Sequence, residues 1–362
     1  LTHSALALGL IGLFRVIPIV LFSLLGGVVA DVISRRKLLL VTQSMLVLVS
    51  VALAATTILG LIAPAIIYLL TGIAAGVAAF DSPARQALVP SLVPPKRLTN
   101  ALSISSTAFQ VATVIGPSLA GIIIATRGVA AVYLIDVVSF LAVLLVLFLI
   151  RPPMVEGAVQ RVSLAAAAEG LHFVWRSPII LATMGLDFVA TFFGSATALL
   201  PIFARDILHV GPTGYGPLYA APSAGAVLAG VMMSFVAGRI RAQGKVILVA
   251  VAAYAAFTIL FGLSRVFLLS LLFLAGVGAS DTVSMILRQT VRQSTTPDAL
   301  RGRMTSVNMV FFMGGPQLGE FEAGVVARLG GAPLSVVTGG IAALLLAGVI
   351  ALTAGRLRAY RV

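Results

Sequence analysis

The sequence predicts an all-α protein that crosses a membrane several times, and three observations lead to this prediction. Of its 362 residues 60% are hydrophobic and only 10% are charged, whereas a soluble domain has roughly 25% charged residues. The mean hydropathy is +1.14. Apolar stretches of about 20 residues, long enough to cross a bilayer core of about 30 Å, recur along the whole chain. Lipid offers the backbone no hydrogen-bond partner, so we expect these spans to be helices; the alternation typical of barrel strands is not seen.

Glycine and proline residues divide the apolar sequence into eleven expected helices. The uncharged run Leu38–Phe80 is too long for one span, and the turn residues between Gly60 and Pro64 divide it. The expected helices are 4–30, 38–59, 64–82, 101–125, 131–150, 179–200, 214–237, 246–263, 266–286, 304–327 and 333–354.

The basic residues gather in alternate loops between these spans. Nineteen of the 24 Lys and Arg residues, Arg288 and Arg292 among them, fall in one set of loops and in the C-terminal tail. Four fall in the opposite loops, and the remaining one, Arg15, lies within a span. Because basic loops stay on the cytoplasmic side, this bias predicts a multi-pass protein of the cell membrane with a cytoplasmic C-terminus. It also explains the net charge of +13 without a nucleic-acid partner.

The chain repeats itself after about 200 residues. Internal repeats built of spans are typical of transporters, which handle the substrate between the two halves. We therefore predict an N-terminal bundle (1–150), a cytoplasmic connector with an amphipathic helix after Ser163 (151–178), and a C-terminal bundle (179–362). Five spans precede the connector and six follow it, so we expect the first span to be missing from this sequence; a genuine eleven-span protein is the alternative. The repeat pairs Asp81, Arg85-Gln86, Pro94-Pro95 and Gly116-Pro117 with Asp281, Arg288-Gln289, Pro297 and Gly315-Pro316.

The end of the first expected helix and the loop after it contain the residues of a gate motif, namely Gly27, Asp31, Arg35 and Arg36. It resembles the G-x-x-x-D-R-x-G-R-R motif of the major facilitator superfamily, with Val32 and Ser34 departing from the usual Arg and Gly. The resemblance implies the fold of two six-helix bundles and a cytoplasmic gate that holds the halves together. The alternative is that the basic residues only fix the topology.

A second motif lies in the helix expected at 101–125. Gly116, Pro117 and Gly121, with Ala112 and Ala120, resemble the fifth-helix motif of exporters of this superfamily. Small residues allow close helix packing, and Pro117 removes a backbone hydrogen bond. The resemblance implies export, and ordinary helix packing is the alternative. The segments 81–86 and 200–216 resemble the branch that contains the enterobactin exporter and macrolide-efflux proteins.

Ionisable residues inside spans are costly and therefore indicate functional positions. Burial can bring a carboxyl into the range in which it exchanges a proton near neutral pH. Glu320 is the first candidate for proton coupling, because its helix contains the Gly315-Pro316 break. Gly72 stands where drug–proton antiporters of the superfamily often have Arg, so the resemblance supports export more than proton coupling. The other candidates are Asp187, Asp136, Glu322 and Arg15, for which headgroup contacts or a structural ion pair are the alternatives.

The sequence thus predicts a secondary active transporter that exports a small amphipathic molecule, a drug-like compound or siderophore, by proton antiport with alternating access. An uptake facilitator or lipid flippase of the same fold, or a receptor that transports nothing, are the alternatives. The chain has no cysteine and no phosphate-loop, H-E-x-x-H or G-x-S-x-G motif, and its three histidines are far apart. We therefore expect no catalytic residues, metal or cofactor, and a monomer whose partners are substrate, protons and lipid.

Overall fold

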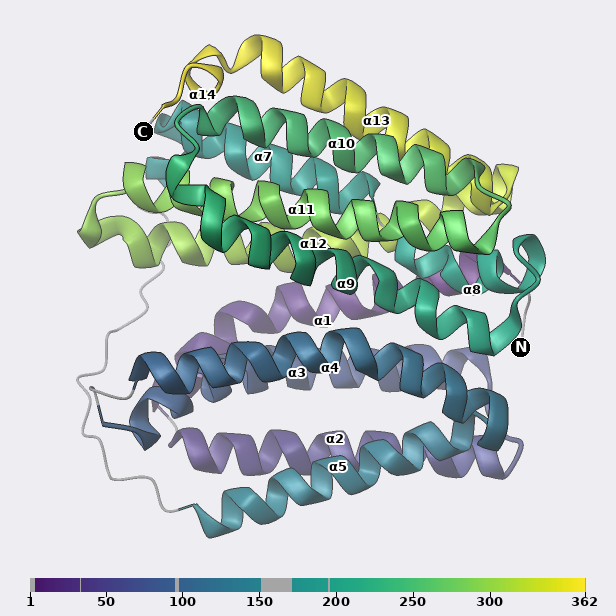
Figure 1. The fold of residues 1–362 in the computed structure, drawn as a ribbon. Helices are drawn as coiled ribbons and strands as arrows, with labels where there is room; N and C mark the ends of the chain where they lie inside the picture. Colours follow the sequence, from purple (N-terminus) through teal and green to yellow (C-terminus); the bar gives the residue numbers. More distant parts are fainter. Residues whose placement is uncertain (1–3, 33, 95–97, 151–170, 195, 362) are drawn as a thin grey trace. The chain divides into compact units, whose positions relative to one another are not determined.

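The computed structural model describes residues 4–32, 34–94, 98–150, 171–194 and 196–361. Every element in these ranges is helical, and the long helices follow the predicted order (Figure 1). They are α1 (Ala5–Val32), α2 (Arg35–Ile58), α3 (Pro64–Leu92), α4 (Leu98–Arg127), α5 (Val129–Leu149), α7 (Pro178–Phe193), α9 (Gly211–Val236), α10 (Gln243–Leu263), α11 (Phe267–Thr295), α12 (Asp298–Gly330) and α13 (Ala332–Thr353).

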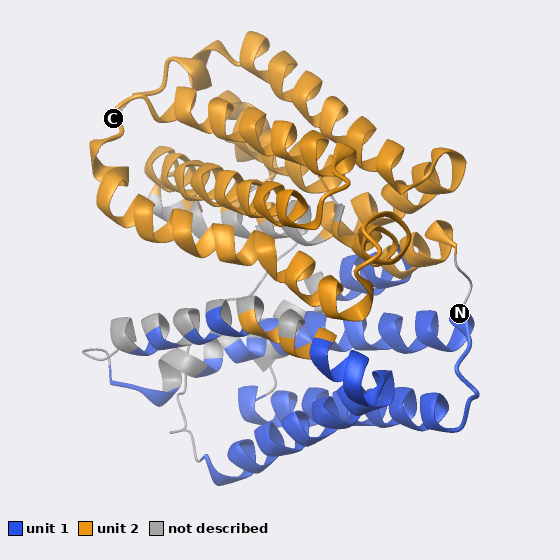
Figure 2. Cartoon of the chain, turned by 45° about the vertical axis from the view of Figure 1, so that its right-hand side comes forward, with its two compact units in different colours: residues 1–3, 13–112, 122–162 blue, residues 4–12, 113–121, 163–362 orange. Residues whose placement is uncertain are grey.

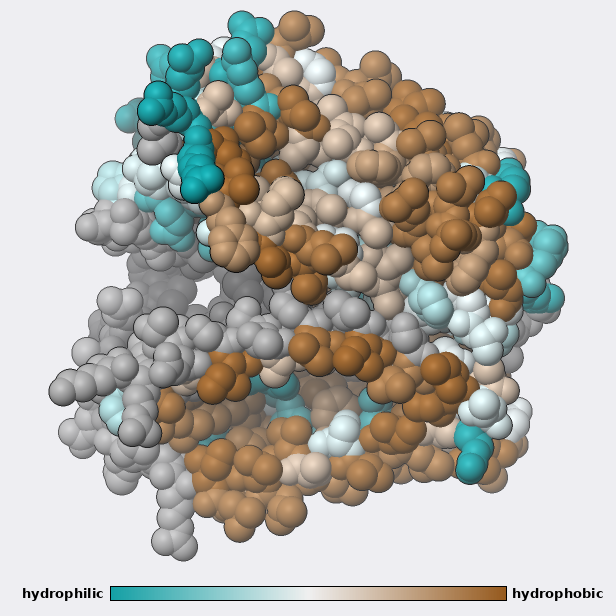
Figure 3. Space-filling view, viewed as in Figure 1, coloured by the Kyte–Doolittle hydropathy of each residue, from teal (hydrophilic) through white to brown (hydrophobic). Residues whose placement is uncertain are grey.

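Nine candidate spans in the described part of the chain are long and apolar enough to cross a membrane, judged by length and composition. The helices α4 and α12 are not among the nine, so the count of eleven spans stays a prediction. Exposed apolar side chains on α9, α11 and α13 fit a lipid-facing surface; they include Leu228, Phe235, Leu268, Leu345 and Leu352. Figure 3 shows hydrophilic residues gathered around α14 (Gly355–Arg358) near the C-terminus. Most of the surface over α13 is apolar in the same view.

Proline and glycine set several helix ends. Proline is the first residue of α3 and α7, where its missing N–H is not needed. Gly128 and Gly331 have φ angles of 80° and 86° and form the turns before α5 and α13. The helix expected at 179–200 ends earlier, at Phe193. It is followed by the short elements η2 (Ala196–Leu199), α8 (Leu200–Ile202) and the π-helical η3 (Phe203–Ile207).

The chain forms two compact units, coloured separately in Figure 2. In unit 1, α2 packs against α3 and α5 around a core that includes Leu39, Leu88 and Leu147. In unit 2, α11 packs against α9 and α10, while α7 packs against α12 and α13. The predicted bundle boundaries at 150 and 179 stay a prediction. Unit 1 comprises 1–3, 13–112 and 122–162, and unit 2 comprises 4–12, 113–121 and 163–362.

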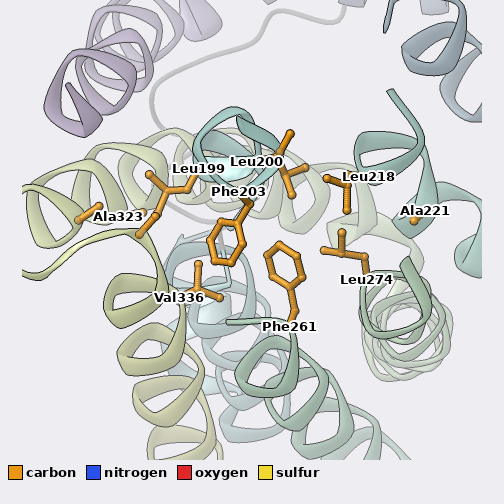
Figure 4. Packing of buried hydrophobic residues seen from close by; sticks show 12 residues of the cluster. Leu199, Leu200, Phe203, Leu218, Ala221, Phe261, Leu274, Ala323 and Val336 are labelled. Atoms are coloured by element: carbon orange, nitrogen blue, oxygen red, sulfur yellow. The ribbon is translucent and has the colours of Figure 1, made fainter. Parts of the chain in front are cut away.

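An aromatic core fixes α11 within unit 2. The rings of Phe203 on η3 and Phe261 on α10 have centroids 4.5 Å apart, and Figure 4 shows Leu274 of α11 beside them. Both aromatic side chains are fully buried. Such a ring pair contributes about 0.5–1.5 kcal/mol beyond the burial of its area. This core holds one end of α11, and the polar face of that helix continues toward its other end.

The described end of the connector, residues 171–176, is helical. Val174 is buried with Ile180, Met184 and Met304, while Leu171 and Trp175 are exposed. Ser163 and most of the predicted amphipathic helix lie outside the described residues.

Candidate functional site

A cluster of charged side chains is buried in unit 2. Asp187 on α7 is 5% exposed and pairs with two arginines of α11. The Nη2 atom of Arg288 lies 2.9 Å from Oδ1 of Asp187, and Nη1 of Arg292 lies 3.4 Å from Oδ2. Arg288 is 1% exposed and Arg292 6%. These ion pairs, shielded from solvent, join α7 to α11.

The cluster extends to a second acid and to α12. The Nη2 atom of Arg288 also lies 3.4 Å from Oδ1 of Asp281, and Nη1 of Arg292 donates to Oδ1 of Asn308 at 2.8 Å. Arg288 is seven residues from Asp281 and four from Arg292, so all three share one face of α11. We call Asp187, Asp281, Arg288, Arg292 and Asn308 the charge cluster.

The two acids and two arginines of the charge cluster balance in formal charge. This balance matters because removing one member of a buried ion pair costs about 3–5 kcal/mol. Pairing is nevertheless incomplete: among the described residues, Nε and Nη1 of Arg288 and Oγ of Ser284 have no hydrogen-bond partner. Buried polar groups left in this state are rare, and inside a membrane protein they indicate a functional position.

The prediction that Arg288 and Arg292 lie in a loop is wrong, while the cytoplasmic side predicted for them stays a prediction. The helix α11 continues to Thr295, beyond the expected end at 286, and it buries both side chains against its neighbours. The spacing to Asp281, together with the apolar residues Leu287 and Val291 beside the arginines, was the available signal. The sequence therefore identified Asp187 but missed the other members of the cluster.

Asp81, the repeat counterpart of Asp281, is buried in unit 1 and closely held. Its Oδ1 atom accepts hydrogen bonds from Thr42 Oγ1 at 2.9 Å and from Gln43 Nε2 at 2.7 Å, and its Oδ2 atom pairs with Arg85. Three side chains from α2 and α3 therefore satisfy this carboxylate.

The remaining candidate acids and Arg15 are not members of the charge cluster. Glu320 is half-buried on α12, twelve residues beyond Asn308, which corresponds to roughly 18 Å along a helix. Glu322 is half-buried on the same helix, and Asp136 is exposed near the start of α5. Arg15 is half-buried on α1. Within the described residues, no group of three or more His, Cys, Asp or Glu side chains could hold a metal ion.

The comparisons with known proteins show to which family the chain belongs. The sequence profile of the transmembrane secretion effector family, a branch of the major facilitator superfamily, matches residues 1–361. The chain belongs to this family. It is 26% identical to the multidrug efflux pump Tap of Mycolicibacterium fortuitum, over 98% of this chain and 88% of Tap. It is 27% identical to the enterobactin exporter EntS of Citrobacter koseri, over 100% of this chain and 86% of EntS.

Solved structures of transporters share the fold of this transmembrane secretion effector protein. The nucleoside transporter NupG superimposes with a TM-score of 0.74 at 14% identity, covering 96% of this chain and 91% of NupG. The human organic anion transporter MFSD10 superimposes with a TM-score of 0.62 at 17% identity, covering 94% of this chain and 83% of MFSD10. The predicted all-α major facilitator fold is therefore confirmed. The protein is a multi-pass membrane transporter and not an enzyme.

The gate motif of this transporter spans the end of α1 and the start of α2. Arg36 donates from Nε to the Leu147 carbonyl oxygen at 2.7 Å and from Nη2 to that of Phe148 at 2.9 Å. These carbonyls end α5, so Arg36 acts as a C-terminal cap within unit 1. The gating role of the motif stays a prediction. Its other residues are Gly27 and Asp31, whose side chains lie outside the described residues, and Arg35, which begins α2.

The exporter-type motif lies in α4, where its glycines have different surroundings. Gly116 is exposed, with open space around it. Gly121 is buried, and a methyl group added there would lie 2.9 Å from the Pro212 carbonyl oxygen and 3.1 Å from Cα of Gly216, all within unit 2. Gly121 therefore permits the close packing expected of the motif. The side chain of Pro117 lies outside the described residues.

Proposed function

We propose that this protein exports a small amphipathic molecule, a drug-like compound or a siderophore, across the bacterial cell membrane in exchange for protons. The names of two relatives, an efflux pump and an enterobactin exporter, support the direction of transport and the class of substrate. The exporter-type motif at Gly116, Pro117 and Gly121 supports the same direction. The charge bias of the loops supports a cytoplasmic C-terminus.

The observation that carries the coupling proposal is the buried charge cluster. Alternating access requires a ligand that binds two conformations with different affinity, because only such a ligand shifts their populations. In the cluster, Arg288 contacts both Asp187 of α7 and Asp281 of its own helix. Adding a proton to Asp187 removes the charge pairs that join α7 to α11, and adding one to Asp281 leaves Arg288 to pair with Asp187 alone. A proton can thereby change the stability of one helix arrangement relative to another.

Transport into inside-out membrane vesicles tests this function. Vesicles from cells that produce the full-length protein are energised with an acidic interior, and the accumulation of ethidium and of enterobactin is followed. We expect accumulation of at least one of them, and its loss when an ionophore collapses the pH gradient. Vesicles from cells without the protein are the control.

The alternatives predict different results in the same vesicles. Flux in both directions that ignores the gradient would indicate a facilitator. Movement of labelled lipid between leaflets, without accumulation of either compound, would indicate a flippase. Binding without flux would indicate a receptor. Each of these results contradicts proton-driven export.

A further inference from the structure

Asp281 occupies the centre of α11. The helix has 29 residues, so this carboxyl lies roughly 21 Å from either end. Its side chain is nevertheless 39% exposed, in contrast to the 7% of Asp187. A carboxyl in the middle of an apolar span is costly and therefore indicates a function, and exposure permits exchange of a proton with water.

The two acids that contact Arg288 are not equivalent. Asp187 pairs with Arg288 at 2.9 Å and with Arg292 at 3.4 Å, whereas Asp281 contacts Arg288 alone, at 3.4 Å. Neutralising either acid leaves two arginines and one acid, but without the charge of Asp187 the side-chain partner left to Arg292 is the uncharged Asn308. Neutralising Asp281 would leave Asp187 between its two arginines. Because an unpaired buried charge is strongly unfavourable, the second change costs the protein less.

The internal repeat supports the same distinction. Asp81 occupies the corresponding place in the first half and is held by Thr42, Gln43 and Arg85. Its geometry shows that this position in the repeat can hold a fully paired carboxylate. The single long contact of Asp281 is therefore a specific feature of the second half.

The groups around Asp281 come from four helices. Arg288 approaches from α11 and Asp187 from α7, while Tyr254 of α10 lies within electrostatic range. The hydroxyl of Tyr254 donates to the Gly194 carbonyl oxygen at 3.2 Å. The helix α9 packs along residues 275–282 with its segment 222–230, which has no titratable side chain. Among the described residues, the cation in direct contact with Asp281 is thus Arg288, which stays paired with Asp187 when Asp281 is neutral.

We propose that Asp281 is the carboxyl that carries the exchanged proton, and that Asp187 stays ionised as the permanent counter-ion of Arg288 and Arg292. This assignment rests on the proton exchange proposed above. A proton from water on the outer side forms an O–H bond on Asp281, and the contact with Arg288 breaks. Arg288 then pairs with Asp187 alone. When the cytoplasmic side opens, the proton returns to water and Arg288 again contacts both acids.

The test uses Asp281→Asn in the full-length protein, and Asp206→Asn serves as the matched control. Asp206 is an exposed acid that pairs with the exposed Arg205. Infrared spectra over a pH titration report the C=O stretch of protonated carboxyls and need no substrate. We expect Asp281→Asn to remove one component that the wild type and the control retain. In vesicles, the gradient-driven accumulation of ethidium by Asp281→Asn should fall to the level without a gradient, while downhill exchange persists.

The outcomes separate the two proposals. If the wild type couples to protons and Asp281→Asn still does so, or if its infrared spectra match those of the wild type, the assignment of Asp281 is overturned and the proposed function stands. If the wild type shows no proton-driven transport, the proposed function itself is wrong. Asp281→Glu retains a carboxyl and covers the case in which Asp281→Asn does not fold. The Asp281→Glu variant should keep proton-coupled transport, but the pH dependence of its transport rate should be shifted relative to the wild type. An unchanged pH dependence would contradict the assignment.

Discussion

Arg288 and Asp187 form an ion pair, with Nη2 2.9 Å from Oδ1, in which both side chains are almost completely buried. The two residues are a hundred positions apart in the sequence, and the pair joins α7 to α11 within unit 2. Any rearrangement that separates these helices must break this pair or replace it. The pair therefore connects the stability of unit 2 to the conformational change that transport requires.

Replacing Asp187 by Asn should destabilise the protein strongly. Arg288 and Arg292 would lose their shared acid, and the loss of one partner from a buried ion pair costs about 3–5 kcal/mol. Thermal unfolding of purified protein in detergent should show a clearly lower midpoint. Adding Arg292→Gln removes the excess positive charge and leaves Arg288 with Asp281, so the double variant should recover part of the loss. Equal midpoints for Asp187→Asn and the wild type would show that the pair contributes little.

The helix positions could be predicted from the sequence because apolar length and turn residues are local signals. Asp187 could be found in the same way, since a charge inside an apolar run stands out. Arg288 and Arg292 could not, because they lie near the end of α11, where charged residues normally face water. Their burial depends on α7, which packs against α11 and is about a hundred residues away in the sequence, and Arg292 also bonds to Asn308 of α12. Asn308 has no local signal of any kind.

Removing the cap that Arg36 provides should weaken the junction of α2 and α5. Hydrogen bonds from a charged donor contribute about 1.5–3 kcal/mol, and Arg36 makes two to the end of α5. We expect Arg36→Gln to lower the unfolding midpoint and to speed hydrogen exchange in the last turn of α5. Lys37→Gln, which changes the exposed neighbouring charge, is the control. If Arg36→Gln and Lys37→Gln lower the unfolding midpoint equally, the effect comes from the loss of a positive charge and not from the loss of the cap.

Gly278 allows α11 and α9 to approach closely, and Gly278→Ala should disturb this contact. A methyl group at position 278 would overlap the carbonyl oxygen of Pro222, which cannot move without bending α9. The matched control is Gly348→Ala on α13, where the added carbon meets open space. Alanine there should be neutral or stabilising by about 0.5–1 kcal/mol. Purified yield and unfolding midpoint should fall for Gly278→Ala alone, and equal losses in both variants would contradict the packing argument.

The charge bias of the loops predicts the orientation of the protein, and single cysteines can test it because the chain has none. Arg176→Cys lies at the end of the connector and Arg127→Cys at the end of α4, and both positions are exposed. In intact cells an impermeant maleimide should label Arg127→Cys and spare Arg176→Cys. Permeabilised cells should label both. Labelling of Arg176→Cys in intact cells would reverse the predicted topology.

Glu320 offers the sharpest test of where coupling occurs, because it was the first candidate from the sequence and is not a member of the charge cluster. The two locations are separated by roughly 18 Å along α12, measured from Asn308. If the cluster carries the proton, Glu320→Gln should change the rate of ethidium transport but keep its dependence on the pH gradient. If Glu320 carries it, the same variant should transport only downhill, because Gln mimics a permanently protonated carboxyl. Measuring initial rates with and without the gradient, in vesicles matched for protein content, distinguishes the two. We expect the gradient dependence to survive in Glu320→Gln and to disappear in Asp281→Asn, since Asp281 shares Arg288 with a second acid that can keep it paired.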